Sequence, residues 1–359
     1  KISTGLLTED RLRPFLPYLN DEEITDIDWH GDSLWVNTIY NESKMIPANQ
    51  HTVTKEYINS FVQNVANSQS KFFNKENYKL ETDSEELCLR ITCLHESVAK
   101  TGTAVFLRKT TIKPRLSYNK LINEKYCSEQ ILNLLINCVI GKFNVVVGGG
   151  PEAGKTEFGK YLSLYIPEEQ HTITIEDTLE WHYHELKPNA SNTPLQVNEN
   201  FTYEEALKEC MRMNAKRVIL SEIRSVEAMR LIELWNAGSK GITSIHTDDG
   251  RKVPDRILNM MPTRLDAERL ENNIYENLDV VVMLRRKKDE NGKLYRYIDQ
   301  IVFFDRVDGE NKYYMFMNNG NVIDMELPKT KVEKLKKEYI ENPFFISEDL
   351  KETYERKED

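Results

Sequence analysis

Residues 144–156 read Asn-Val-Val-Val-Gly-Gly-Gly-Pro-Glu-Ala-Gly-Lys-Thr, and this stretch decides the fold of the chain. The apolar run Asn144–Val147 predicts a buried strand, and the pattern over Lys155–Leu164 predicts a helix directly after it. Between them, residues 149–156 fit Gly-x-x-x-x-Gly-Lys-Thr. Because a strand precedes this pattern and a helix follows it, the pattern predicts a phosphate-binding P-loop.

A P-loop binds phosphate through its backbone as well as its side chains. Glycines let successive N–H groups turn toward phosphate oxygens, and the N-terminus of the following helix adds positive potential. We expect Lys155 to reach the β- and γ-phosphates of ATP and the Thr156 hydroxyl to bind Mg²⁺. The predicted nucleotide contacts in this segment are Gly149, Gly150, Pro151, Glu152, Ala153, Gly154, Lys155, Thr156 and Glu157.

Further short apolar runs after the P-loop alternate with helical segments. This alternation predicts parallel βαβ units, and hence a RecA-like P-loop domain with a mostly parallel sheet over residues 129–327. The strands are expected at Thr172–Ile175, Val218–Leu220, Ile242–Ile245 and Val280–Leu284.

Three of these strands are followed by residues that suit hydrolysis of a γ-phosphate. Glu176 and Asp177 follow one strand, Glu222 follows another, and His246 follows a third. The carboxyl ends of parallel strands form the edge of the sheet at which ligands bind. We therefore expect Glu176, Asp177 and Glu222 to bind Mg²⁺ together with Thr156. The expected catalytic residues are Lys155, Glu176, Glu222, which polarises the attacking water, and His246, which senses the γ-phosphate.

The first part of the chain has a different pattern. Alternating residues around a Gly-containing turn predict a hairpin of Ile24–Trp29 with Leu34–Val36, and Thr54–Ser68 has the spacing of an amphipathic helix. With strands at Glu86–Cys93 and Thr103–Arg108, these elements predict an N-terminal α+β domain with a mixed sheet. The expected divisions are this domain at 1–116, a linker at 117–128, and a charged, solvated tail at 328–359.

Composition sets outer limits on function. The 359 residues include 48 basic and 58 acidic side chains, a net charge of −10, which argues against a surface that wraps nucleic acid electrostatically. No apolar run approaches the roughly 20 residues of a membrane-spanning helix, and no signal peptide is evident. Five cysteines without a Cys-x-x-Cys pair indicate reduced thiols and no structural zinc. We expect a cytoplasmic protein.

The P-loop by itself leaves the reaction open, because kinases, GTPases and motor ATPases share it. A P-loop kinase acting on a small molecule would need a basic lid and an acceptor pocket. A regulatory module would hold nucleotide without turnover. Both remain alternatives to an ATP-hydrolysing motor at this level of evidence.

Four motifs in order resemble a known family, the secretion and traffic ATPases of type II and type IV secretion, type IV pili and conjugation. They are the Walker A loop at 149–156, an Asp-box-like segment at 173–180, a Walker-B-like segment at 218–224 and a His-box-like segment at 238–247. The resemblance covers Ile131–Arg286 well. Glu176-Asp177-Thr178 and the absence of a four-Cys module favour the conjugation and tight-adherence branch, although Ser221 stands where Gly is usual.

The resemblance implies properties that the residues alone do not. It implies a hexameric ring that works with inner-membrane secretion or pilus platform proteins, at the cytoplasmic face of the membrane and without sequence-specific nucleic-acid contacts. It also implies that Arg90 and Arg108 of the N-terminal domain reach the nucleotide. Arg212 and Arg224 match arginines of the family with nucleotide, intersubunit or structural roles.

Overall fold

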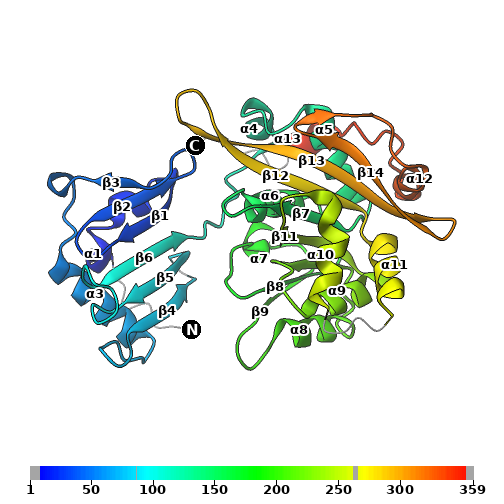
Figure 1. Ribbon diagram of the computed structural model, residues 1–359. Coiled ribbons are helices and arrows are strands. Elements are labelled where there is room, and N and C mark those ends of the chain that lie inside the picture. The colour runs from blue at the N-terminus through cyan, green and yellow to red at the C-terminus, as the bar shows by residue number, and fades with distance from the viewer. Residues whose placement is uncertain (1–8, 86, 262–265, 353–359) are drawn as a thin grey trace. The chain divides into compact units, whose positions relative to one another are not determined.

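The computed structural model describes residues 9–85, 87–261 and 266–352 (Figure 1). The chain divides into two compact units. Unit 1 runs to Thr111 and also includes Lys288–Tyr295, and unit 2 comprises Ile112–Lys287 and the chain from Arg296 onward. No helix among the described residues is long and apolar enough to cross a membrane.

Unit 1 is built on a six-stranded sheet in the order β3-β2-β1-β6-β5-β4. Every neighbouring pair in it is antiparallel, so the sheet is not mixed as the sequence predicted. The predicted hairpin is confirmed, whereas β3 and β4 were not predicted. The strands are β1 Ile24–Trp29, β2 Leu34–Thr38, β3 Lys44–Ile46, β4 Lys79–Ser84, β5 Leu89–Leu94 and β6 Ala104–Lys109.

Helix α3 (Lys55–Ser68) covers this sheet, as its spacing predicted. The Thr54 side chain caps its N-terminus by accepting a hydrogen bond from the Tyr57 N–H. Its buried face contributes Ile58, Phe61, Val62 and Val65 to a core shared with the sheet. The shorter helices of the unit are α1 Glu9–Leu12, α2 Leu16–Leu19 and the 3₁₀ turn η2 Ala48–Gln50.

Residues 288–295 contact Tyr40 and Glu42 of unit 1. The Leu294 N–H donates to the Tyr40 carbonyl oxygen at 2.7 Å. Lys288 forms an ion pair with Glu42 at 2.8 Å, and the Lys293 ammonium lies 4.0 Å from the centre of the Tyr40 ring. These residues connect β12 (Val280–Lys288) to β13 (Leu294–Val307), two strands that lie mostly in unit 2, so the tip of that hairpin belongs to unit 1.

Unit 2 contains a nine-stranded sheet in the order β15-β14-β13-β12-β7-β11-β10-β8-β9. The six strands from β12 to β9 are parallel to one another, which confirms the predicted P-loop domain with a mostly parallel sheet. Strands β9 and β13–β15 were not predicted. The strands are β7 Val145–Gly149, β8 Thr172–Glu176, β9 Asn192–Gln196, β10 Arg217–Leu220, β11 Lys240–His246, β12 Val280–Lys288, β13 Leu294–Val307, β14 Glu310–Asn318 and β15 Asn321–Val322.

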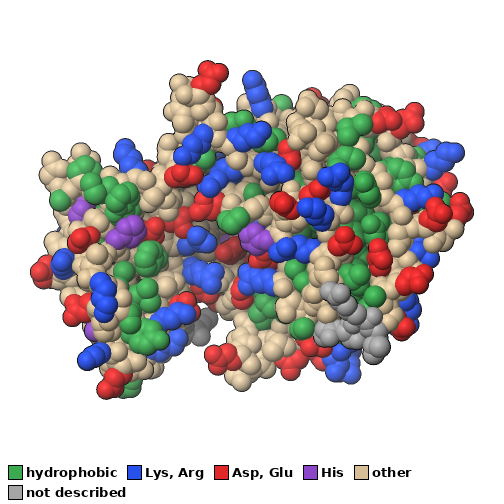
Figure 2. Space-filling view, in the orientation of Figure 1, with side chains coloured by type: hydrophobic (Ala, Val, Ile, Leu, Met, Phe, Trp, Pro, Cys, Tyr) green, Lys and Arg blue, Asp and Glu red, His purple; other side chains and the backbone are tan. Residues whose placement is uncertain are grey.

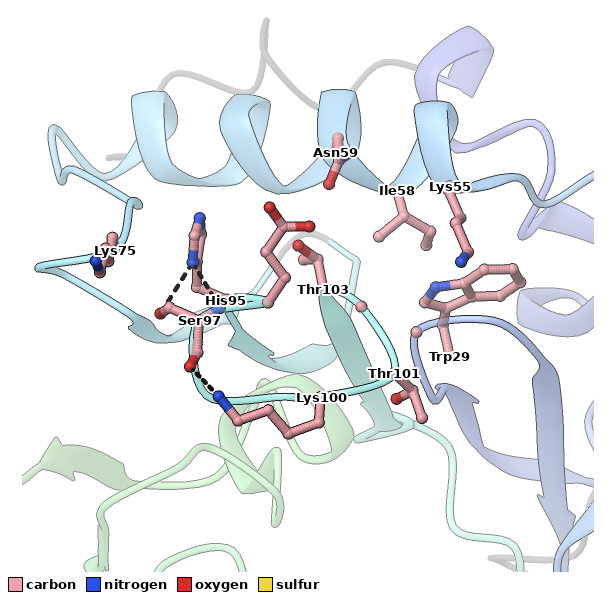
Figure 3. A pocket seen from close by; sticks show the side chains of 13 residues that line it. Trp29, Lys55, Ile58, Asn59, Lys75, His95, Ser97, Lys100, Thr101 and Thr103 are labelled. Carbon is pink, nitrogen blue, oxygen red and sulfur yellow. Dashed lines mark hydrogen bonds between the residues drawn. The ribbon is translucent and has the colours of Figure 1, made fainter.

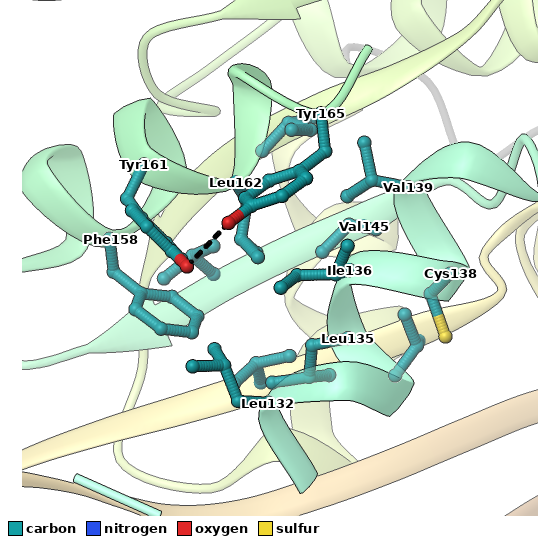
Figure 4. Close-up of a cluster of buried hydrophobic side chains, with 14 of the residues drawn as sticks. Leu132, Leu135, Ile136, Cys138, Val139, Val145, Phe158, Tyr161, Leu162 and Tyr165 are labelled. Atoms are coloured by element: carbon teal, nitrogen blue, oxygen red, sulfur yellow. Dashed lines mark hydrogen bonds between the residues drawn. The ribbon is translucent and has the colours of Figure 1, made fainter. Parts of the chain in front are cut away.

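Side chains of alternate residues in the central strands enter two separate cores, one on each face of the sheet. In β7, Val145 and Val147 enter the core formed with α5 (Glu129–Ile140) and α6 (Lys155–Ser163), part of which Figure 4 shows. Val146 enters the core on the opposite face, formed with α8 (Tyr203–Cys210), α9 (Glu227–Asn236), α10 (Val253–Met260) and α11 (Ala267–Asn277). Strands buried on both faces are apolar at every position, which is why Val145–Val147 is so easily recognised. The helices of unit 2 are α4 Tyr118–Asn123, α5 Glu129–Ile140, α6 Lys155–Ser163, α7 Tyr183–Leu186, α8 Tyr203–Cys210, α9 Glu227–Asn236, α10 Val253–Met260, α11 Ala267–Asn277, α12 Lys329–Lys337 and α13 Glu348–Glu352, with the 3₁₀ turn η3 Gly250–Lys252.

Two predicted divisions differ from the structure. Residues 117–128, expected to be a linker, include helix α4, whose Tyr118 and Leu121 are buried in the core of unit 2. The tail from residue 328 is not simply solvated, because Leu335 and Ile346 enter the same core. Each segment therefore buries some of its apolar residues, although its many polar and charged residues had made the pattern look like exposed chain.

Basic and acidic side chains are interspersed on the face shown in Figure 2. Mixed charge of this kind gives no extended field of one sign on that face.

Candidate nucleotide site

The register of the parallel strands brings the predicted site residues to one edge of the sheet. His246, the last residue of β11, lies opposite Gly149, the last residue of β7. On the other side of β11, Leu220 of β10 lies opposite Thr243, and it also lies opposite Ile175 of β8. The segments that follow β7, β8, β10 and β11 therefore start side by side.

Two glycines give the P-loop its shape. Gly154 forms the N-cap of α6 and has φ of +90°, a backbone conformation that residues other than glycine rarely adopt. A Cβ atom on Gly149 would lie 2.8 Å from the Leu284 carbonyl oxygen of β12, so only glycine fits between the two strands. With these constraints the loop turns directly into the N-terminus of α6, which is the geometry for binding phosphate.

The Lys155 side chain lies within the loop. Its Nζ donates to the carbonyl oxygens of Gly149 and Gly150 at 3.1 and 2.9 Å, and lies 3.3 Å from His246 Nδ1. The residue is only 8% exposed, and burial lowers its pKa, although the Glu222 carboxylate opposes this shift. The ammonium group is thus held beside the positions that phosphate oxygens occupy in a P-loop.

A chain of polar contacts runs from Lys155 to the predicted acidic residues. His246 Nε2 lies 3.2 Å from a Glu222 carboxylate oxygen, and Arg224 Nε donates to the other at 2.8 Å. Arg224 also donates from Nη1 to the Asp177 carboxylate at 2.8 Å. Burial, followed by the Lys155 charge, lowers the pKa of His246, so the imidazole is neutral at pH 7. A neutral ring can accept from Lys155 at Nδ1 and donate to Glu222 from Nε2.

Hydroxyl groups of Tyr203, Ser221 and Ser244 form hydrogen bonds to the segments that carry these polar contacts. No motif in the sequence had pointed to these hydroxyl groups. The Asp177 N–H donates to the Tyr203 hydroxyl at 2.9 Å, and this hydroxyl shares a 2.9 Å hydrogen bond with Ser221 Oγ. The Ser244 hydroxyl donates to the Ser221 carbonyl oxygen at 2.6 Å. These bonds link β8, β10 and β11 and so hold the acidic segments in register.

Glu176 has partners of a different kind. Its side chain is 2% exposed, and one carboxylate oxygen accepts from the N–H groups of Glu180 and Trp181 at 2.9 and 3.0 Å. Burial raises the pKa of this carboxyl to about 8. The structure thus places Glu176 against the turn that follows β8, where it orders the backbone. Its predicted metal-binding and catalytic roles remain predictions.

The buried carboxyl makes stability depend on pH. Folded protein retains a proton on Glu176 that the unfolded chain loses above its ordinary pKa of 4.5, so stability should fall as pH rises from about 4.5 to about 8. Glu176→Gln has no such proton but keeps an acceptor oxygen. We expect its melting temperature to exceed the wild-type value at pH 8, by a margin that shrinks toward pH 5, in thermal unfolding without nucleotide. Glu185→Gln, an exposed carboxylate on α7, is the control. Equal pH dependence in both variants would contradict this account.

The rest of the loop has partners that the sequence did not reveal. Arg286 of β12 forms an ion pair with Glu152, and Arg296 Nε of β13 donates to the Glu152 carbonyl oxygen at 3.1 Å. Ala153 is buried, and its N–H lies 3.4 Å from the Gly150 carbonyl oxygen. An arginine of β12, two residues beyond the predicted strand, and one of the unpredicted strand β13 thus contact the loop. Pro151 and Thr156 lie within this segment, at the turn and at the start of α6.

Glu157 contacts the chain just before α4 instead of the loop. Its carboxylate accepts from the Arg115 N–H at 3.0 Å. The Arg115 Nε and Nη2 atoms are buried, and neither has a hydrogen-bond partner in the structure. Buried guanidinium donors without a hydrogen-bond partner cost free energy. Such a group can be found only in the folded structure, because no sequence pattern shows that Arg115 is buried.

The predicted arginines outside the P-loop are exposed. Arg90 and Arg108 lie directly opposite each other on β5 and β6 of unit 1, and Arg108 Nε pairs with Asp26 at 2.8 Å. Like charges at directly opposed positions are unfavourable in a sheet, and here carboxylates lie beside both, since Asp26 pairs with Arg108 and Asp83 of β4 lies opposite Arg90. Arg212 follows α8, with its side chain 73% exposed and 3.5 Å from Glu209.

The residues present fit a nucleotide better than a free metal ion. In the described part of the chain, no three His, Cys, Asp or Glu side chains are clustered closely enough to hold a metal. A Mg²⁺ ion in such a site takes most of its ligands from phosphate and water and only one or two from the protein. The loop, in contrast, has the shape and the ammonium group that phosphate requires.

Comparison with known proteins finds a family model, sequence relatives and solved structures that match this chain. The family model described as "Type II/IV secretion system protein" matches residues 61–325. An uncharacterised protein of Bacillus anthracis is 26% identical over 81% of this chain and 68% of its own length. The type IV secretion system protein VirB11 of Brucella suis biovar 1 is 32% identical over a shorter match, which covers 38% of this chain and 41% of that protein. The Legionella pneumophila ATPase DotB shares the fold, with a TM-score of 0.58 and 12% identity over 84% of this chain and 82% of its own.

Proposed function

Because the chain belongs to the type II/IV secretion system protein family, we propose that it is an ATP-hydrolysing motor of a type IV secretion, conjugation or pilus-assembly machine. The observation that carries the proposal is the continuous set of contacts from Lys155 through His246 and Glu222 to Arg224 and Asp177. It joins a phosphate-binding loop to a carboxylate that can act as a base, as hydrolysis by water requires.

Binding of ATP exchanges one set of contacts for another. The phosphates take the place of the Gly149 and Gly150 carbonyl oxygens as partners of Lys155 Nζ. His246 then loses the ammonium at Nδ1 and becomes free to respond to the γ-phosphate. Glu222, still held by Arg224, orients and deprotonates the attacking water. Loss of the γ-phosphate reverses the exchange.

A magnesium ion bound with the nucleotide would neutralise charge on the phosphates during this step. Thr156 at the start of α6 would hold it directly, with Asp177 and Glu222 acting through water. Glu176 belongs to the same predicted set, although its carboxylate is already committed to the turn at residues 180 and 181.

The motor function extends beyond one chain. We propose that six copies form a ring, that Arg90 and Arg108 of unit 1 contact the nucleotide, and that Arg212 contributes near a subunit boundary. The N-terminal unit would then supply arginines to a nucleotide held by the P-loop unit. The ring would act at the cytoplasmic face of the membrane through secretion or pilus platform proteins, which handle the transported substrate.

The test is Mg²⁺-dependent ATP hydrolysis by the wild type and by Lys155→Ala. Loss of one charged hydrogen-bond donor costs about 1.5–3 kcal/mol, so we expect hydrolysis to fall about 10- to 100-fold. Phosphate release is measured at saturating and subsaturating ATP. Lys208→Ala, an exposed lysine on α8, is the matched control and should keep wild-type activity.

Two results would overturn the proposal. If the wild type hydrolyses no more ATP than Lys155→Ala under conditions that support a ring, the protein is a nucleotide-binding module without turnover. If phosphate passes to an added metabolite faster than to water, the protein is a kinase.

A further inference from the structure

Basic side chains are spread out in one part of the molecule and converge in another. Unit 1 contains a pocket of about 570 Å³ around Trp29, in which Lys55 and Lys75 lie at opposite ends of the wall (Figure 3). In unit 2, by contrast, Arg286 of β12 and Arg296 of β13 both contact one residue of the P-loop, Glu152. Two guanidinium groups thus meet at the loop that would bind phosphate.

Glutamate is an unfavourable residue at position 152 for two reasons. Its φ is +55°, in the left-handed region that residues with a side chain seldom adopt. Its carboxylate also places a negative charge in a loop that would bind an anion, so the carboxylate would repel a phosphate group bound there. Both features are tolerable only if other groups hold the backbone of Glu152 and balance its charge.

Arg286 balances the charge. Its Nη1 atom donates to a carboxylate oxygen of Glu152 and forms an ion pair with it. The Arg286 side chain is 25% exposed and the Glu152 side chain is 58% exposed, so the pair lies near the surface and adds little to the stability of the fold. Its electrostatic effect on a phosphate group is a separate matter. With Arg286 in place, the phosphate meets a neutral ion pair instead of an uncompensated carboxylate.

Arg296 holds the backbone. Its Nε donates to the Glu152 carbonyl oxygen at 3.1 Å, and its Cδ lies only 3.2 Å from the place that a Cβ atom on Gly154 would take. In a trans peptide the C=O and the following N–H point in opposite directions. The Ala153 N–H therefore turns away from Arg296 and toward the Gly150 carbonyl oxygen across the loop, 3.4 Å away. A phosphate oxygen in the loop can accept a hydrogen bond from an N–H turned in this way.

We propose that Arg286 and Arg296 are positioning residues for the phosphates of the nucleotide, and that both act through Glu152. Arg286 neutralises the Glu152 carboxylate, and Arg296 orients the Glu152 carbonyl group so that the next N–H faces the ligand. Neither arginine lies in the four motifs, and neither has to touch the nucleotide in this role. The role rests on the proposed function, since it requires that the P-loop binds ATP.

Paired substitutions of Arg286 and Glu152 test the role of charge. Binding of the non-hydrolysable ATP analogue AMP-PNP with Mg²⁺ is measured by titration calorimetry on the full-length protein. We expect Arg286→Gln to weaken binding about 5- to 20-fold, because the carboxylate then repels several phosphate charges. Arg286→Lys keeps the positive charge and should lose much less. Arg286→Gln/Glu152→Gln should return to within about 2-fold of the wild type, since the repelling charge is gone as well.

Two further readouts separate this role from simple support of the fold. The difference in affinity between Arg286→Gln and the wild type should shrink as KCl rises from about 0.1 to about 1 M, because the Debye length falls from about 10 to about 3 Å. Without nucleotide, Arg286→Gln should melt close to the wild-type temperature, because a pair this exposed stabilises the fold little. A residue that only supported the fold would lower the melting temperature and show no such dependence on salt.

Arg296 has a different expected result in the same titration. Arg296→Gln should weaken binding of AMP-PNP about 3- to 10-fold, because the peptide after Glu152 loses the hydrogen bond that orients it. Glu152→Gln should not restore this loss, since Arg296 contacts the backbone oxygen and not the carboxylate. Arg230→Gln is the matched control for both arginines. It breaks another arginine–glutamate pair of unit 2, with Glu233 on α9, and should bind AMP-PNP like the wild type.

Three outcomes would overturn the proposal while leaving the motor function intact. They are wild-type affinity in Arg286→Gln and Arg296→Gln, an equal loss in Arg230→Gln, or a loss in Arg286→Gln that Glu152→Gln does not restore. The last would mean that Arg286 contacts the phosphates itself instead of acting through Glu152. If the wild type binds no AMP-PNP at all, the positioning role and the proposed function fail together, and the two kinds of failure are thus told apart.

Discussion

A Glu222→Gln protein is expected to bind ATP with near wild-type affinity and to hydrolyse it about 10²- to 10⁴-fold more slowly, the range for loss of a general base. The substitution is nearly isosteric and keeps an oxygen to accept from Arg224 Nε, now at 2.8 Å. It removes the carboxylate that accepts a proton from the attacking water, and an amide cannot take over that role. Binding is expected to persist because Lys155 and the loop glycines are untouched.

Binding and turnover must be measured separately for this variant. Affinity is followed with a fluorescent nucleotide and hydrolysis by phosphate release at saturating ATP. Glu233→Gln on α9, whose carboxylate pairs with Arg230 at 2.8 Å, is the control and should leave both unchanged. Wild-type hydrolysis by Glu222→Gln would remove Glu222 from the role of base and return Glu176 to consideration.

The largest effect on stability is expected at Asp279, which is buried and accepts three hydrogen bonds. Lys331 and Lys334 donate to its carboxylate at 2.9 and 2.6 Å, and the Asn144 N–H donates at 2.8 Å. Burial alone would raise the pKa of Asp279, but the two lysines outweigh it and hold the pKa below its ordinary value. The carboxylate thus attaches the C-terminal helix α12 to the start of β7, the strand that leads to the P-loop.

Asp279→Ala is expected to lower the free energy of unfolding by about 3–5 kcal/mol, because Lys331 is left charged and buried without its partner. Urea denaturation at pH 7 measures this value. Glu338→Gln is the matched control. Glu338 lies in the same C-terminal segment and forms a more exposed ion pair with Lys142, so its loss should cost about 0–1 kcal/mol. A cost at Asp279 no larger than at Glu338 would show that the buried pair does not anchor the tail.

The same residue predicts a dependence on acid. Since the pKa of Asp279 is lower in the folded state, its contribution is present above the ordinary pKa of 3.8 and is lost as pH falls through the folded value. The wild type should therefore lose stability below about pH 4 more steeply than Asp279→Ala.

Local features of this fold could be predicted from sequence because their signals lie in adjacent residues. The strand, loop and helix of residues 144–164 and the hairpin from Ile24 are examples, and both are confirmed. The packing of the C-terminal segment could not be predicted. Lys331 can be buried because its ammonium pairs with Asp279, which lies 52 residues earlier in the sequence. From sequence alone, a lysine-rich stretch is predicted to be exposed to solvent, because the acidic residue that pairs with a buried lysine cannot be identified.

The candidate site follows the same division. Residues that follow strands, such as Glu222 and His246, could be named from motif order, and the structure brings them within 3.2 Å of each other. Tyr203 and Arg296 carry no motif and were missed, although they contact Asp177 and the P-loop backbone. The pocket around Trp29 has lining residues spread over 75 positions from 29 to 103, so only folding reveals it.

The chain passes between the two units at 111/112, 287/288 and 295/296, because the tip of the β12–β13 hairpin belongs to unit 1. A single tether would let one unit swivel freely against the other, and a cut after residue 111 would release it. The hairpin is a second connection, made of two adjacent strands, and Lys288, Lys293 and Leu294 at its tip contact Tyr40 and Glu42 of unit 1. Leu284 of β12 lies opposite Gly149. The hairpin whose tip belongs to unit 1 therefore includes the strand that pairs directly with β7, the strand that ends in the P-loop.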